Sequence, residues 1–98
     1  MDKTAEKDKR ILVSHFNGIW LYLEREVLSE ERVYYNVLAK YNYSDAVYSF
    51  DSERVSGKFP KKQEALVKAW IYMREEEIRA ALHVWNEDKE ILKIEGLK

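Results

Sequence analysis

The hydrophobic repeat of this chain changes from a period of two to a helical period at Pro60, its only proline. Before that point, apolar side chains alternate with polar ones, as they do in strands that bury one face. After it, apolar residues recur at the three- and four-residue spacing of a helix. The order of the two patterns predicts an α+β fold in which a small antiparallel sheet of three to four strands comes before the helices.

The first extended region runs from Ile11 to Leu23, with a bend or turn at Asn17-Gly18. In its second half, Ile19, Leu21 and Leu23 fall on one face, and Trp20 and Tyr22 fall on the other. Both faces are therefore apolar, which favours a central strand. The charged residues 26–32 that follow are predicted to form a connection.

A hairpin is predicted next, because residues 33–40 and 46–51 alternate regularly around turn-forming residues at 42–45. Its first run is expected to turn Val33, Tyr35, Val37 and Ala39 toward the core. Residues 54–58 are expected to add a short edge strand.

A helix is expected to start near Pro60, because proline suits the first helical position. Two apolar stripes follow, one through Trp70 and one through Trp85, and they are turned from one another. This offset predicts one kinked helix or two short helices divided near Arg74. The acidic residues 75–77 are then either a solvated face or the first turn of the second helix. A short terminal strand through Ile91, Leu92 and Ile94 is expected to close the fold.

Composition fits one domain, with residues 1–10 forming a disordered polar tail and residues 11–98 a single α+β domain. Hydrophobic residues make up 46% of the chain, so it is too apolar to be disordered throughout. It has no cysteine, which excludes disulfides, thiolate metal sites and cysteine nucleophiles. The N-terminus lacks the apolar core of a signal peptide and no run is long enough to span a membrane. A cytoplasmic protein is predicted.

No catalytic signature stands out. The two histidines, His15 and His83, are not brought together by their spacing, and no nucleophile is marked out beside either. The three glycines are isolated from one another, so no phosphate-binding loop is present. The sequence therefore predicts no catalytic residue, no metal site and no cofactor, and it favours a non-enzymatic protein.

Two groups of residues are candidates for binding. Lys58, Lys61 and Lys62 flank the predicted helix start, where free backbone N–H groups favour anions; the alternative is that they are solvated lysines. Tyrosines are dense between positions 34 and 48, and about half are expected to be core. If Tyr34 and Tyr48 share an exposed face, a protein interface is favoured over an RNA platform, because few basic residues accompany them. The candidate interface consists of Tyr34, Tyr41, Tyr43 and Tyr48.

Several short motifs occur together in one order along nearly the whole chain. They are Phe16-Asn17-Gly18-Ile19, residues 55–62 (VSGKFPKK), residues 66–70 (LVKAW), Trp85 and residues 93–97 (KIEGL). This collinear set resembles the small bacterial domain of unknown function 4160 (DUF4160) family. The resemblance implies an α+β domain with a short sheet followed by helices.

The same resemblance implies a site and a partner class. Members of the family often carry a His-x-His pair on a strand, which could hold a metal or share a proton. Here Tyr34 and Asn36 stand in its place, so no metal or acid–base role is carried over, and they mark a degenerate pocket. Members also resemble components of toxin–antitoxin-like gene pairs, which implies a protein partner.

These observations lead to three functional hypotheses. The first is a non-enzymatic protein-interaction module, in its narrower form a component of a toxin–antitoxin-like pair. The alternative is a nucleic-acid-binding toxin or small hydrolase that uses His15 or His83 as a base and the lysine cluster for phosphate. A third is a purely structural subunit of a homo-oligomer. The formal charge of -1 gives no global field for nucleic acid, and no membrane partner is expected.

Overall fold

The computed structural model describes residues 10–29, 32–86 and 93–97, and in these ranges the chain forms five strands followed by two helices. The predicted α+β fold is confirmed, and the sheet has one strand more than the three to four expected. The elements are β1 (Arg10–Phe16), β2 (Ile19–Ser29), β3 (Arg32–Tyr41), β4 (Ser44–Tyr48), β5 (Arg54–Lys58), α2 (Lys61–Met73) and α3 (Glu75–Asn86).

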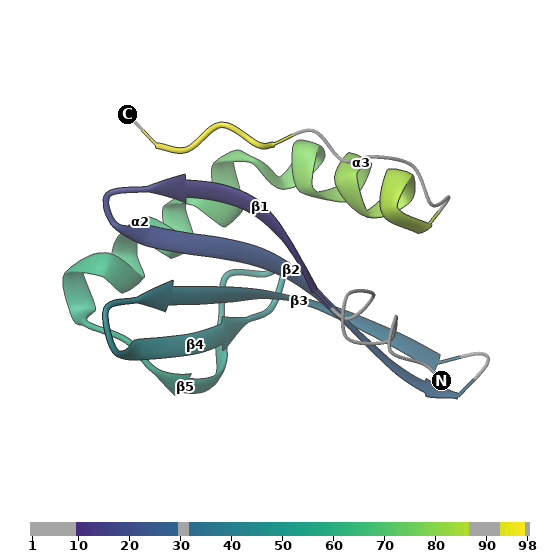
Figure 1. Ribbon diagram of the computed structural model, residues 1–98, viewed down its shortest axis with the longest axis horizontal. Coiled ribbons are helices and arrows are strands. Elements are labelled where there is room, and N and C mark those ends of the chain that lie inside the picture. Colours follow the sequence, from purple (N-terminus) through teal and green to yellow (C-terminus); the bar gives the residue numbers. More distant parts are fainter. Residues whose placement is uncertain (1–9, 30–31, 87–92, 98) are drawn as a thin grey trace.

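The sheet is an antiparallel meander in which each strand pairs with its neighbours in the chain, in the order β1-β2-β3-β4-β5 (Figure 1). Two of its hairpins turn where the sequence predicts. Asn17 and Gly18 both have positive φ angles, 51° and 76°, as a tight two-residue hairpin turn requires. Asn42, with φ at 54°, opens the turn between β3 and β4. The edge strand expected at 54–58 is β5.

Two boundaries differ from the prediction. Residues 26–32 were expected to be a connection, but β2 continues to Ser29 and β3 begins at Arg32, with Glu26 opposite Tyr34. Charged side chains did not prevent strand formation, because main-chain pairing does not depend on burial of the side chains. Arg10 belongs to β1 opposite Glu24 rather than to a tail. Residues 1–9 of the predicted tail lie outside the described residues.

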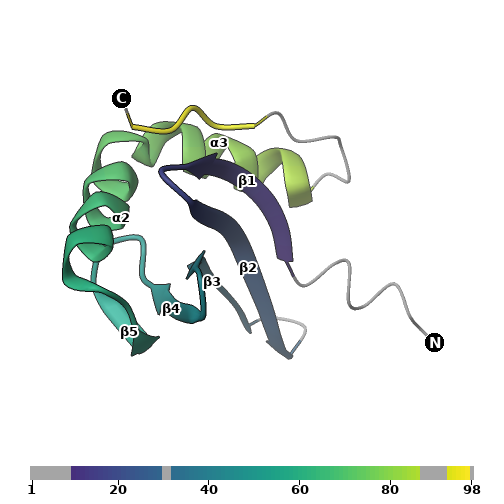
Figure 2. The same cartoon turned by 60° about the vertical axis from the view of Figure 1, so that its left-hand side comes forward.

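The two helices lie over one face of the curved sheet (Figure 2). We call this the core face, because Leu21, Leu23, Val37 and Ala39 are fully buried there. Trp70 of α2 is also fully buried in the same cluster. The prediction that Val37 and Ala39 face the core is confirmed.

The helical region divides where the two stripes predicted. Arg74, with φ at -110°, separates α2 from α3, and Glu75–Glu77 form the exposed, acidic first turn of α3. Pro60 precedes the first helical residue and occupies the N-cap, where its carbonyl accepts the Glu64 N–H at 2.8 Å. Neither described helix has the length and apolar character needed to cross a membrane.

The C-terminal segment, residues 93–97, runs beside β1 (Figure 1). It makes one backbone hydrogen bond to that strand, from the Ile94 N–H to the Val13 carbonyl at 2.7 Å, and does not form a regular strand. Ile91 and Leu92 of the predicted terminal strand lie outside the described residues. The segment thus supplies Ile94 to the core while covering part of the β1 edge.

Candidate functional site

The second face of the sheet, turned away from the helices, is what we call the open face. Cross-strand pairing aligns its side chains in two long rows, because residues directly opposite one another share a face. The apolar row contains Leu12, Tyr22, Leu38, Val47 and Ser56, and the polar row contains His15, Trp20, Lys40, Asp45 and Lys58. Together the rows extend across all five strands.

Trp20 is the most exposed aromatic residue of these rows, with 42% of its surface accessible. The His15 ring stacks on its indole with centroids 3.7 Å apart and planes 7° from parallel. Such stacking limits the orientations that the indole can adopt. The open face therefore presents a large, oriented aromatic surface near the hairpin turn that joins β1 to β2.

The apolar row lies beside Trp20, on the side away from the hairpin turn. Leu38 is 6% exposed, whereas Leu12, Tyr22 and Val47 are half-buried. The Arg10 guanidinium lies 6.0 Å from the centre of the Tyr22 ring. Charged and polar side chains rim the row: Glu24, Asn36, Lys40, Asp45 and Lys58. An apolar patch inside a polar rim is typical of an interaction surface.

The four tyrosines of the candidate interface do not form one surface. Tyr48 lies opposite Val37 on the core face, whereas Tyr34 lies opposite Glu26 on the open face, so these two do not share a face. Tyr41 packs against the core, and Tyr43 is fully exposed in the hairpin turn. Of the four, only Tyr34 contributes to the open face, because the alternation of β3 and β4 places Tyr41 and Tyr48 toward the helices.

Tyr48 instead joins β4 to α2 and β5. Its hydroxyl donates to Glu64 Oε2 at 3.0 Å, and the same oxygen accepts from Arg54 Nε at 2.7 Å. Burial, followed by the hydrogen bond and negative charge of Glu64, raises the pKa of Tyr48 far above its usual value, and Arg54 lowers it in part. This tyrosine therefore has a structural role.

The three candidate anion-binding lysines are exposed but divide between two elements. Lys58 ends β5 on the open face opposite Asp45, whereas Lys61 and Lys62 begin the helix that covers the core face. Glu64 adds a carboxylate to the same first helical turn. This arrangement brings acidic groups near the lysines and provides no single anion cradle.

Tyr34 and Asn36, the residues of the degenerate pocket, lie on the open face of β3. Tyr34 is half-exposed opposite Glu26, and Asn36 is half-buried opposite Glu24. Among the described residues, no three histidine, aspartate or glutamate side chains gather as metal ligands would. The pair thus forms part of the rim of the open face.

Sequence reasoning placed Trp20 and Tyr22 together on one strand face without assigning them a role. The sequence contained a signal for an apolar second face, because Ile19, Leu21 and Leu23 on the opposite face of the same strand were already enough to form its core side. The sequence did not show that the helices cover only one of the two faces of the sheet. The position of His15 against Trp20 also depended on the β1–β2 register.

No family model, curated protein or solved structure matches the chain. The resemblance to the DUF4160 family accordingly stays a prediction from the sequence.

Proposed function

We propose that this chain is a protein-interaction module that binds a protein partner through the open face, with Trp20 as its central anchor. The observation that carries the proposal is the exposure of Trp20, the second residue of β2, beside an apolar row and on a face that no described helix covers.

Aromatic side chains are the usual anchors of protein interfaces, because they bury a large area at a low cost in conformational entropy. A sheet with one solvated face normally carries polar side chains there. Here the partly exposed Leu12, Tyr22 and Val47 carry hydrophobic surface on three strands, and Leu38 lies buried between Tyr22 and Val47 in the same row. The surface has the apolar centre and polar rim of a binding site.

The charges of the rim favour a protein over a nucleic acid. Asp45 lies between Lys40 and Lys58 in the polar row, and Glu24 flanks the apolar row. Phosphate backbones are bound by clusters of basic groups, and each intervening carboxylate opposes that attraction. The alternative of a nucleic-acid-directed toxin or hydrolase has no comparable supporting observation.

A narrower proposal rests on the resemblance to DUF4160. It holds that the chain is a bacterial, cytoplasmic component of a toxin–antitoxin-like pair, whose partner is encoded next to it. The missing histidine pair, replaced by Tyr34 and Asn36, supports binding rather than metal or acid–base chemistry at that position.

The test is quantitative affinity purification from the native host with three forms of the chain. Trp20→Thr combined with Tyr34→Thr removes the proposed anchor and the exposed tyrosine of the open face, and it retains residues that favour strands. Tyr72→Ala is the matched control, because Tyr72 is 80% exposed on α2, away from the open face. We expect a stoichiometric partner to be retained by wild type and Tyr72→Ala and reduced at least about tenfold with the double variant.

Equal recovery of the partner with all three folded proteins would show that binding uses another surface. Recovery of nucleic acid alone, lost as the salt concentration rises, would replace the proposal with the nucleic-acid hypothesis.

A further inference from the structure

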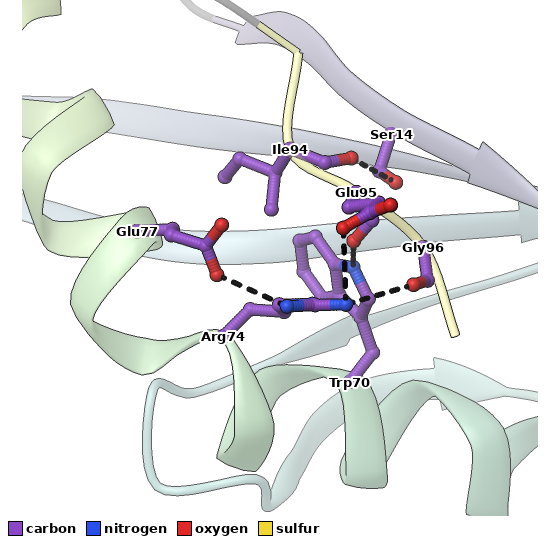
Figure 3. A network of polar contacts seen from close by, with 7 residues as sticks. All are labelled: Ser14, Trp70, Arg74, Glu77, Ile94, Glu95 and Gly96. Carbon is purple, nitrogen blue, oxygen red and sulfur yellow. Dashed lines mark hydrogen bonds and ion pairs between the residues drawn. The ribbon is translucent and has the colours of Figure 1, made fainter. Parts of the chain in front are cut away.

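Both edges of the sheet are obstructed by groups of the chain itself. At the β1 edge, residues 94–96 are held by hydrogen bonds from side chains of β1, α2 and the α2–α3 junction (Figure 3). At the β5 edge, Arg54 Nη1 donates to the Gly57 carbonyl at 2.7 Å, so this acceptor is not available to an added strand. Two β5 strands paired antiparallel in register would also bring Arg54 opposite Lys58 of the copy, where like charges repel. Association of two sheets through their faces is therefore favoured over pairing at their edges.

The charges of the open face are divided between its two ends, with the apolar row between them. The basic end contains Lys40, Asp45 and Lys58, and the acidic end contains Arg10, Glu24 and Glu26. Two lysines and one carboxylate make the first end net positive, and two carboxylates and one arginine make the second net negative. None of the six forms an ion pair with another described residue. Their charges are therefore available to a partner.

Two copies of such a face are complementary to one another. Sheets that pack face to face commonly keep their strands nearly aligned, about 10 Å apart. A twofold axis along the apolar row places each apolar side chain over its own copy, and the basic end of one sheet over the acidic end of the other. Lys40 then lies near Glu24 of the copy, and Trp20 faces the cross-strand pair of Arg10 and Glu24 of the copy. Each end thus meets its opposite charge.

The other aligned packing has its twofold axis along the strands and is opposed by charge. In that arrangement each row lies over itself in reversed strand order. Lys40 belongs to β3, the central strand of the five, so it would lie over Lys40 of the copy. Like charges brought together in an interface are unfavourable. The charges therefore favour the axis along the apolar row.

We propose that the partner of the open face is a second copy of this chain, packed with the apolar rows together and the basic end of each copy against the acidic end of the other. The inference rests on the proposed function, because it names the partner of that same surface. Burial between the copies would give Glu24 and Lys40 the opposite charges that buried ions require. The helices of both copies would lie on the outside of a β-sandwich.

The size of the open face sets the expected affinity. Five strands about 4.8 Å apart give a width of about 24 Å, and the run from Trp20 to Glu26 gives a length of about 23 Å. The flat area is thus about 500 Å² per copy, or about 1,000 Å² for the pair, which is near the smallest total area of a specific interface. A reversible dimer with a micromolar dissociation constant is expected.

Sedimentation equilibrium of the full chain measures this dimerisation. Wild type should be dimeric at about 300 μM and largely monomeric at about 1 μM. Lys40→Glu and Glu24→Lys should each raise the dissociation constant at least about tenfold, because each substitution brings like charges together between the copies. The matched control is Lys62→Glu, the same charge change on the exposed surface of α2, which should leave the dissociation constant unchanged.

The chain that carries both Lys40→Glu and Glu24→Lys should recover most of the wild-type affinity. Within one chain the two residues are offset by about 13 Å along the strands, too far apart for direct contact. Recovery would therefore report a contact between the copies.

Three results would overturn the inference. The first is a wild type that stays monomeric at about 300 μM; the affinity purification with the Trp20 and Tyr34 variants then decides separately whether a different protein binds the open face. The second is a dimer that Lys40→Glu does not weaken, which would place the contact on another surface. The third is a loss that the double exchange does not restore, which would exclude the axis along the apolar row.

Cross-linking decides the question if the charge variants do not fold. The chain has no cysteine, so a single introduced cysteine is a specific probe. Ser56 is exposed at the β5 end of the apolar row, where the proposed dimer places it over its own copy. A short bismaleimide should join two Ser56→Cys chains at the concentration at which the dimer forms, and it should not join two Tyr72→Cys chains, whose cysteine lies on α2. Absent or equal cross-linking of the two variants overturns the proposal.

Discussion

The two faces of the sheet are formed by the same strands and contain similar residue types, yet they differ in burial. The core face places Leu21, Val37 and Tyr48 against the helices, where they are fully buried. The open face places Trp20, Val47 and Tyr34 in the corresponding outward positions, where they stay partly or largely exposed. Apolar character alone therefore does not determine which face of a strand becomes core.

Interruption by charge distinguishes the faces. On the core face, Ile19, Leu21 and Leu23 of β2 and the β3 partners Ala39 and Val37 form a continuous apolar stretch. Arg25, which follows on the same face, hydrogen-bonds Asn86 and lies over the Trp85 ring of α3, so its charge has partners there. The open face is interrupted by Glu24 opposite Asn36 and by Lys40 opposite Trp20. Burying Glu24 or Lys40 beneath a helix would require a partner for each charge. The helices consequently cover the continuous face.

The largest expected contrast comes from replacing one tyrosine on each face. Tyr48→Ala should lower the free energy of unfolding by about 3 to 5 kcal/mol, because it leaves a cavity and leaves Glu64 without the phenol. Tyr34→Ala should change it by less than about 0.5 kcal/mol. Urea denaturation of the two variants measures the difference, and equal losses would contradict the assignment of the faces.

A second matched pair uses valine. Val37→Ala removes two methyl groups from a fully buried position and should cost about 2 kcal/mol. Val47→Ala, on the half-buried apolar row, should cost less than about 1 kcal/mol. Both losses of free energy are obtained from the midpoints of urea denaturation, provided that the slope of the unfolding free energy against urea concentration is unchanged. A larger loss at Val47 would indicate that the open face is covered in solution, which would sharpen the case for an interface there.

The pH dependence of stability tests Tyr48 in its buried environment. Its folded pKa is raised above the unfolded value of about 10, so its contribution is fully present below pH 10 and is lost as the pH rises beyond it. The stability advantage of wild type over Tyr48→Phe should therefore fall by about 1.4 kcal/mol per pH unit above pH 10. Urea denaturation at pH 9, 10 and 11 measures it, and a constant difference would contradict the burial of the phenol.

The order of the elements, two hairpin turns, the edge strand and the division at Arg74 were predictable, because each depends on local chemistry. Asn17-Gly18 forms a tight turn, and the angular offset between the two apolar stripes indicates a division of the helical region. The extension of β2 to Ser29 was not predictable, because charged residues such as Glu26 interrupt the apolar pattern, whereas the pairing of this part of β2 with β3 is through the main chain.

The candidate site depended more strongly on the tertiary arrangement. The lysines and tyrosines were grouped by proximity in sequence, but alternation sent Tyr34 and Tyr48 to opposite faces. The contacts of the C-terminal segment with β1 could not be predicted either, because they join residues as distant in the chain as Ser14 and Ile94.

The smallest expected effect measures how far the open face stabilises itself. His15 and Trp20 stack closely but are both exposed, so their coupling energy should be about 0.5 kcal/mol, at the low end for aromatic pairs. A double-mutant cycle of His15→Ala and Trp20→Thr, followed by urea denaturation, isolates this energy. The cycle of His15→Ala with Tyr34→Ala is the control, because these residues are not cross-strand partners and the effects of the two substitutions should be additive.

A coupling energy between His15 and Trp20 above about 1.5 kcal/mol would mean that the stack behaves as buried structure. In that case Trp20 would be part of a second small core rather than an anchor for a partner, and the two faces would differ less than their exposure indicates.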